Sequence, residues 1–164
     1  MGEKEKHFKH VAENLLKDRF KVIDKDTDRP WGGFFVINEE QSSDFIENFF
    51  DGISEEEIKI SGKLSPKILL IEPGKRLSWQ YHNRRAELWQ IVQGPVGVVR
   101  SLTDQQKEMK KCRKGELVKI KQGERHRLVG LEKWAVIAEI WQHVYADHPS
   151  DEKDIVRIAD DYGR

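Results

Sequence analysis

One stretch of this chain decides the fold: Leu77-Ser78-Trp79-Gln80-Tyr81-His82-Asn83-Arg84-Arg85-Ala86-Glu87-Leu88-Trp89. Side chains alternate between faces along a β-strand, so Gln80 and His82 point the same way. If residues 86–93 form the returning strand of a hairpin, Glu87 comes back beside His82. One amide oxygen, one imidazole and one carboxylate then meet within a single bend, and we interpret them as metal ligands.

A second histidine completes the predicted site. His126 follows His82 after forty-four residues and can reach the same place from a distant strand. Two imidazoles and two oxygens suit zinc, which we expect first, and also manganese, cobalt, nickel or iron, because affinity alone does not separate these ions. The predicted ligands of one divalent metal ion are Gln80, His82, Glu87 and His126. The alternative is that these are ordinary strand-end histidines and a solvated carboxylate.

Glycines flank both groups of ligands at a spacing typical of one superfamily. Gly74, five residues, Gln80-x-His82, four residues, Glu87, six residues and Gly94 resemble the first motif of the cupin superfamily, with Gln80 in place of the usual first histidine. The resemblance implies a mainly β fold, namely a cupin barrel (double-stranded β-helix, or jelly roll).

The second cupin motif is present in a modified form. Gly115, seven residues and Gly123-x-x-His126 are similar to it, although Lys121 and Gly130 stand where proline and asparagine are common.

The flanking residues narrow the resemblance. Residues 77–89 are similar to the Leu-Ser-x-Gln-x-His-x-x-Arg-Ala-Glu-x-Trp signature of the type II mannose-6-phosphate isomerase family. Further segments agree in the same order: Arg29-Pro30-Trp31-Gly32, His126-Arg127-Leu128, Asp154-Ile155-Val156-Arg157 and Asp161-Tyr162-Gly163-Arg164. The resemblance covers residues 29–164 and implies metal-dependent interconversion of mannose 6-phosphate and fructose 6-phosphate. In that family the cupin usually follows a nucleotidyltransferase domain, so we expect the isomerase activity alone.

Such an isomerase must hold a sugar phosphate and stabilise an enediolate oxygen, and a divalent ion can do the latter as a Lewis acid. Arginine suits the phosphate because its planar donors bind two oxygens at once. The resemblance places Arg85, Arg157 and Arg164 at motif positions as substrate-binding residues, the first two also as catalytic candidates. The alternative for each is a surface salt bridge.

The motifs do not fix the group that moves the proton. Glu87 is a poor base when a metal ion holds its charge, and arginine stays protonated. Strand alternation leaves Glu139 and Lys119 as candidates for this group, with Glu139 on the same face as Ile137. Lys119 is also a substrate-binding candidate. Glu139 could equally orient His126. The segment 139–143 departs from the family's usual Glu-x-Gln-x-Gly, so we expect an altered pocket wall.

Two other classes of function stay open. One is a metal-dependent cupin with different chemistry, such as a sugar epimerase, or a dioxygenase, which four protein ligands suit less well because its iron needs open positions. The other is a non-catalytic sugar-binding cupin.

Composition fits a cytoplasmic protein, and the resemblance implies a small-molecule partner, a sugar phosphate. Lys plus Arg and Asp plus Glu each number 29, so no net positive charge favours nucleic acid or an anionic membrane. The first residues lack the apolar core of a signal peptide, and no apolar run approaches the roughly twenty residues that span a bilayer. The single cysteine, Cys112, is expected to be an inert or surface thiol.

Periodicity predicts one domain with two parts. Residues 1–28 are expected to form a connector and an amphipathic helix over 4–19, because apolar residues recur there at helical spacing. This helix would pack on the outside of the barrel or form a homodimer contact. The barrel, residues 29–164, would include a short second helix between Ser43 and Gly52. Its expected strands are 67–72, 77–82, 86–93, 96–102, 116–120, 125–129 and 134–141.

Overall fold

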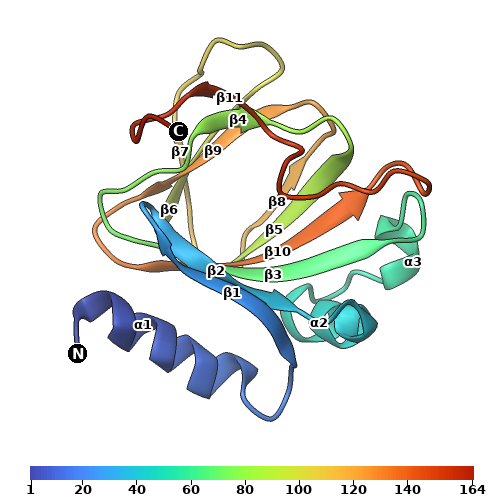
Figure 1. Ribbon diagram of the computed structural model, residues 1–164, viewed down its shortest axis with the longest axis horizontal. Coiled ribbons are helices and arrows are strands. Elements are labelled where there is room, and N and C mark those ends of the chain that lie inside the picture. Colours follow the sequence, from blue (N-terminus) through green and yellow to red (C-terminus); the bar gives the residue numbers. More distant parts are fainter.

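The computed structural model describes all residues, 1–164. Two antiparallel sheets face each other and form a barrel (Figure 1). The six-stranded sheet has the order β1 (Val22–Arg29), β2 (Gly32–Ile37), β3 (Leu64–Ile71), β10 (Ala135–His143), β5 (Arg85–Gln93) and β8 (Leu117–Ile120). The five-stranded sheet has the order β11 (Val156–Ala159), β4 (Trp79–Tyr81), β9 (Arg125–Gly130), β6 (Val96–Ser101) and β7 (Lys110–Cys112). The mainly β barrel expected from the sequence is confirmed.

Strand alternation separates two apolar cores. On β5, Trp89 and Ile91 belong to the cluster inside the barrel, whereas Leu88 belongs to the cluster outside it. On β10, Ile137 points inward in the same way. The predicted inward alternation on these two strands is therefore confirmed. Cys112 is also buried inside the barrel, so it is not a surface thiol.

The helices cover the outer face of the six-stranded sheet (Figure 1). They are α1 (Glu3–Val11), its π-helical continuation η1 (Ala12–Leu16), the 3-10 turn η2 (Glu39–Gln41), α2 (Ser42–Phe49) and α3 (Glu55–Ile58). Phe8 of α1 packs against Phe35 of β2 with 5.5 Å between ring centroids. The apolar stripe of α1 is thus buried within one chain, and the homodimer stays a prediction. Asp18 takes a positive φ of 64°, so the helical segment ends before residue 19.

The prediction of a connector before residue 29 is partly wrong. Residues 22–28 lie in β1, an edge strand whose mostly polar side chains give no apolar alternation. The Arg29-Pro30-Trp31-Gly32 segment contains the turn between β1 and β2. Gly32 has a φ of +143°, and the Leu70 carbonyl oxygen lies 1.9 Å from where a Cβ would stand. A side chain there would force β2 away from β3.

The sequence did not predict several other strands and one helix. β2, β7 and β11 were not expected as strands, and neither was α3 as a helix, whose N-terminus carries a capping box between Ser54 and Glu57. β4 is shorter than the predicted strand 77–82. None of the helices is long and apolar enough to cross a membrane.

Candidate active site

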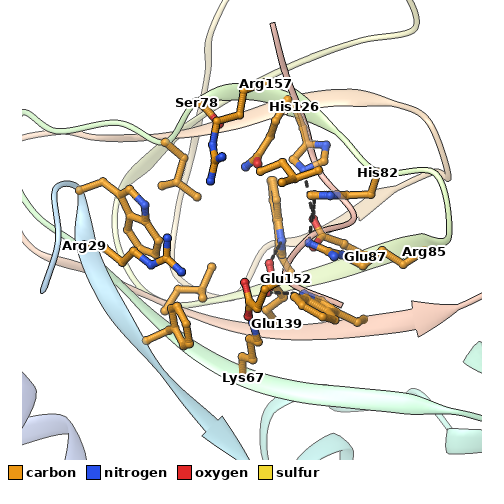
Figure 2. Close-up of a pocket in the computed structure, with 18 of the residues that line it drawn as sticks. Arg29, Lys67, Ser78, His82, Arg85, Glu87, His126, Glu139, Glu152 and Arg157 are labelled. Carbon is orange, nitrogen blue, oxygen red and sulfur yellow. Dashed lines mark hydrogen bonds and ion pairs between the residues drawn. The ribbon is translucent and has the colours of Figure 1, made fainter. Parts of the chain in front are cut away.

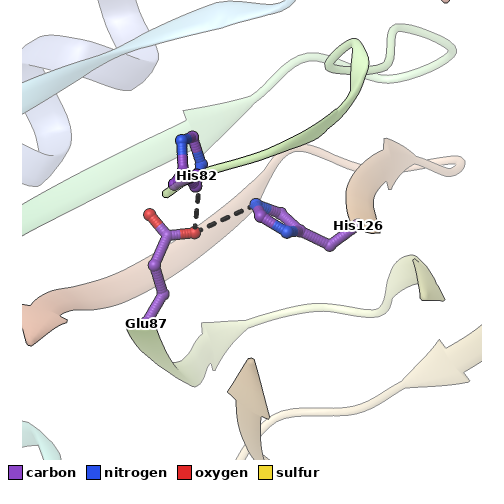
Figure 3. Close-up of side chains that lie close together, drawn as sticks. All are labelled: His82, Glu87 and His126. Carbon is purple, nitrogen blue, oxygen red and sulfur yellow. Dashed lines mark ion pairs between the residues drawn. The ribbon is translucent and has the colours of Figure 1, made fainter. Parts of the chain in front are cut away.

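Three buried side chains converge inside the barrel (Figure 3). His82 directly follows β4, Glu87 lies on β5 and His126 lies on β9. Oε1 of Glu87 is 3.1 Å from Nε2 of His126 and 3.8 Å from Nε2 of His82. The three potential ligand atoms all lie within 4.8 Å of one another. Residues from three strands thus form the cluster that the motif spacing predicts.

Strand pairing explains why these residues meet. Gln80 of β4 pairs directly with His126 of β9. The turn after His82 returns the chain into β5, which carries Glu87, and the Gly123 N–H donates to the carbonyl oxygen of His82 at 2.9 Å. Gln80 is buried and lines the same cavity. The structure therefore brings all four predicted ligands to one region.

The hydrogen bonds of the two imidazoles fit a bound cation. Nδ1 of His82 lies 2.6 Å from the Asp154 carbonyl oxygen, and Nδ1 of His126 lies 2.8 Å from the Glu124 carbonyl oxygen. A carbonyl only accepts, so both Nδ1 atoms carry hydrogen and both rings turn Nε2 toward Glu87. Nε2 of His126 is buried without a hydrogen-bond partner. A divalent cation bound by this atom and by Glu87 would give it a partner.

The charge states agree with this arrangement. Burial lowers the pKa of His82 to about 3, so its ring is neutral near pH 7. Burial alone would raise the pKa of Glu87, but Arg85 and the two imidazoles hold it well below its usual range. Neutral imidazoles and an ionised carboxylate are the states in which these residues bind a metal ion.

Arg85 is bound to its protein neighbours. Its Nε donates to Oε2 of Glu87 at 3.1 Å, its Nη2 donates to Nε2 of His82 at 3.1 Å, and its Nη1 donates to Oγ of Ser150 at 2.9 Å. The guanidinium also lies 3.6 Å from the ring centre of Trp141. Arg85 therefore orients the carboxylate of Glu87 and has few donors left for the phosphate that the sequence assigned to it, and a metal ion on Nε2 of His82 would displace its contact with that ring.

A cavity of about 110 Å³ opens beside the cluster (Figure 2). The ionisable residues around it include Arg29, Lys67, Glu139, Glu152 and Arg157. The cavity therefore carries both signs of charge.

Lys119 does not line the cavity. It is exposed on β8, where its neighbours Val118 and Ile120 point into the barrel core. The expectation that Lys119 binds substrate is wrong, because alternation places its side chain on the outer face.

Glu139 lies in the cavity wall and is 6% exposed. Its two carboxylate oxygens accept hydrogen bonds from the indole N–H groups of Trp89 and Trp141, both at 2.9 Å. Burial, with the nearby charge of Glu87, raises the pKa of Glu139 to about 7. Glu139 does not orient His126, because the Nδ1–H of that ring is held by a backbone carbonyl.

Lys67 is a site residue that sequence reasoning missed. It stands directly opposite Glu139 in the pairing of β3 with β10 and is 5% exposed. Its ammonium lies 2.5 Å from Oε1 of Glu152 and 3.9 Å from the Trp141 ring centre. The signal in the sequence was one charged residue directly before the apolar run 68–71. A lysine is rarely buried unless its ammonium group has a partner, so a buried Lys67 implies one.

Arg29 and Arg157 line the cavity away from His82 and Glu87, whereas Arg85 lies beside those two residues (Figure 2). Arg157 lies on β11, opposite Gln80 of β4, and makes no hydrogen bond or ion pair. Burial lowers the pKa of Arg157, and the charges of Arg164 and Arg29 lower it further. Arg164 instead forms two hydrogen bonds to Asp160, at 2.9 and 3.2 Å. Arg157 is thus the arginine best placed to bind an anion.

Comparison with known families assigns the chain. The profile of the family described as "Mannose-6-phosphate isomerase C-terminal" matches residues 51–160, more than half of the sequence. The chain belongs to this family. The match spans the strands that carry the whole metal cluster, together with Lys67, Glu139 and Arg157. Arg29 and the β1–β2 turn lie outside the matched residues.

Solved structures share the family's cupin fold. A mutant of the oxalate decarboxylase of Bacillus subtilis matches with a TM-score of 0.58 and 13% identity, over 88% of this chain and 33% of that protein. The vicilin of Corylus avellana matches with a TM-score of 0.55 and 14% identity, over 87% of this chain and 35% of that protein. The chain thus spans about a third of each, and the similarity concerns the fold alone. No curated protein sequence matches this chain.

Proposed function

We propose that this protein is a metal-dependent sugar-phosphate isomerase that interconverts mannose 6-phosphate and fructose 6-phosphate. The observation that carries the proposal is a single cavity with two chemical ends. Three buried acceptor atoms converge at one end, and the unpaired guanidinium of Arg157 faces the other (Figure 2). A phosphorylated open-chain sugar matches both ends. The family assignment supports the same reaction.

The metal-binding residues would hold an ion that polarises a substrate oxygen. Gln80, His82, Glu87 and His126 would hold a divalent ion, zinc first among the candidates, which supplies a Lewis acid for a substrate oxygen. Both imidazoles are held in the required orientation by backbone carbonyls, and Arg85 fixes the carboxylate of Glu87. These contacts set the ligand geometry before any substrate binds.

Glu139 is proposed as the group that moves the proton. Its carboxylate takes the proton from the second carbon of the aldose and returns it to the first carbon, while the hydroxyl proton passes from the second oxygen to the first. A base with a pKa of about 7 can accept and release a proton near neutral pH. The two indole N–H groups hold the carboxylate in place.

Arg157 is proposed as the main phosphate-binding residue. A dianionic phosphate would give Arg157 the charged partner that it lacks and would offset the like charges of Arg164 and Arg29 nearby. The planar fork of an arginine binds two phosphate oxygens at once. We also expect the protein to act in the cytoplasm, where sugar phosphates are formed.

A turnover screen tests the proposal. Metal-loaded protein is mixed with hexose, pentose and heptose phosphates, and ketose formation is followed with and without a chelator. We expect mannose 6-phosphate to react, the chelator to stop the reaction and added divalent ion to restore it. If no sugar phosphate is isomerised but one binds tightly, the sugar-binding alternative replaces the isomerase. Inversion of a carbon without ketose formation would indicate an epimerase.

A further inference from the structure

Lys67 has more hydrogen-bonding capacity than the protein uses. Its ammonium carries three N–H donors, and its one hydrogen-bond partner is Oε1 of Glu152, at 2.5 Å. The aromatic rings of Phe34 and Trp141 flank it, with their centres 4.4 and 3.9 Å away. A buried ammonium is costly unless its donors are satisfied. Lys67 therefore has donors available for a ligand in the cavity.

Glu152 is held far less firmly than Lys67. Its side chain is 56% exposed, and the carboxylate has no partner other than Lys67. It lies between β10 and β11, outside both sheets. Lys67, in contrast, projects from the central strand β3 and is 5% exposed. If the contact breaks, Glu152 can move into solvent, whereas Lys67 stays between its two aromatic rings.

The position of Lys67 places its free donors near the proposed base. Lys67 and Glu139 are direct cross-strand partners, and the positive charge of Lys67 lowers the pKa that burial raises on Glu139. An oxygen atom bound by Lys67 would therefore lie beside Glu139. In the free protein that place is taken by an oxygen of Glu152.

We propose that Lys67 binds an oxygen of the open-chain sugar close to the reacting carbons, and that Glu152 is an internal competitor that the sugar displaces. The inference rests on the proposed function and deepens it, because it names a second contact to the reacting end of the substrate. Lys67 acts only as a hydrogen-bond donor and exchanges no proton. The Glu152 oxygen that Lys67 binds stands in for the substrate oxygen.

Calorimetry on the metal-loaded, full-length protein tests the inference. The probe is mannitol 6-phosphate, an open-chain analogue without a carbonyl group, so binding is measured without turnover. Removing the competitor in Glu152→Ala should tighten binding about tenfold, and removing the donors in Lys67→Met should weaken it about tenfold, as expected for one charged hydrogen bond. The double variant should bind like Lys67→Met if Glu152 competes for Lys67. A double variant that binds more tightly than Lys67→Met would show that Glu152 acts through the nearby charge of Arg157 instead, and would overturn the inference.

The controls use exposed residues without side-chain partners. Asp147→Ala removes an exposed carboxylate five residues before Glu152 in the sequence, and Lys133→Met makes the same change as in Lys67→Met at an exposed lysine. Both should bind the probe like the wild type. Melting curves show which variants fold. If Lys67→Met does not fold, Glu152→Gln provides the second variant, because it changes an exposed side chain and should also tighten binding.

The outcomes separate this inference from the proposed function. Binding by Glu152→Ala that is unchanged or weaker overturns the inference, as does absence of binding by that variant. A Lys67→Met protein that folds and binds like the wild type overturns it as well. Tighter binding by Glu152→Ala supports it even if wild-type protein isomerises nothing, and that second result would contradict the proposed isomerase alone.

Discussion

Nε2 of His126 lies 3.1 Å from Oε1 of Glu87, yet it is buried without a hydrogen-bond partner. The hydrogen of the His126 ring is on Nδ1, where the Glu124 carbonyl oxygen holds it. A divalent cation bound by both atoms would give each of these buried groups a partner. This relationship is the structural basis for the metal site and for the first prediction.

Replacing His126 with alanine should abolish stoichiometric metal binding, because the cluster loses one of its imidazole ligands. The measurement is elemental analysis of purified protein. His148→Ala, at an exposed histidine outside the cluster, should keep the wild-type metal content. A folded His126→Ala protein with unchanged zinc, manganese or iron would show that the metal binds elsewhere.

Replacing Asp154 with alanine should weaken metal binding without removing any ligand. The Asp154 carboxylate accepts the N–H groups of Asn83 and Arg84, both at 3.0 Å, while its backbone oxygen holds the His82 ring. Loss of such supporting contacts typically lowers metal affinity about 10- to 100-fold. Competition with a chelator measures the change. Asp154→Asn keeps one acceptor oxygen, so its metal affinity should lie between those of the wild type and Asp154→Ala. Equal metal affinities in these three proteins would exclude a supporting role for Asp154.

Glu139 should make stability depend on pH in a defined window. Its pKa is raised to about 7, so between the ordinary value of 4.5 and pH 7 the folded protein retains a proton that the unfolded chain releases. Stability of metal-free protein should therefore fall as pH rises through this range and level off above it. Glu139→Gln should lack this decline, with a difference of at most about 3 kcal/mol.

Urea unfolding at pH 5 and pH 8, in the presence of a chelator, gives the comparison. Other titrating groups contribute to both proteins and cancel in the difference. Identical pH dependence in wild type and Glu139→Gln would mean that Glu139 titrates normally. In turnover assays the same substitution should remove activity while metal content stays unchanged.

Arg157 should determine the preference for a phosphorylated sugar. Each lost charged hydrogen bond costs about 1.5 to 3 kcal/mol, so Arg157→Ala should raise KM for mannose 6-phosphate at least about tenfold. Arg157→Lys keeps the charge but loses the fork and should recover only part of the affinity. Arg164→Ala should have a smaller effect, because Asp160 already binds that guanidinium. Equal turnover of mannose and mannose 6-phosphate would contradict the assignment.

The sequence predicted the ligand cluster because motif spacing and strand alternation are both local properties. Gln80 and His82 share a face by alternation, and the short turn before Glu87 determines where the chain returns. The approximate place of α1 followed from its apolar periodicity. His126 was different, because it comes from a distant strand and was predicted from the second motif.

The remaining site depends on contacts between distant segments. Nothing in the spacing shows that Lys67 stands opposite Glu139, which follows from the register of β3 against β10. Arg85 looked like a phosphate ligand because its contact with Ser150, sixty-five residues away, is invisible in the sequence. β1 was missed for a different reason. It is an edge strand with many solvent-exposed side chains, so it carries few apolar residues and shows no apolar alternation.

Proton NMR of mannose 6-phosphate in deuterated water, with metal-loaded protein, tests the central claim most directly. The account predicts that fructose 6-phosphate signals appear and that the proton on the second carbon of the aldose is lost or transferred to the first carbon. Neither should occur with Glu139→Gln or His126→Ala. Retention of the second-carbon proton with no ketose formed, by folded and metal-loaded wild-type protein, would contradict the account.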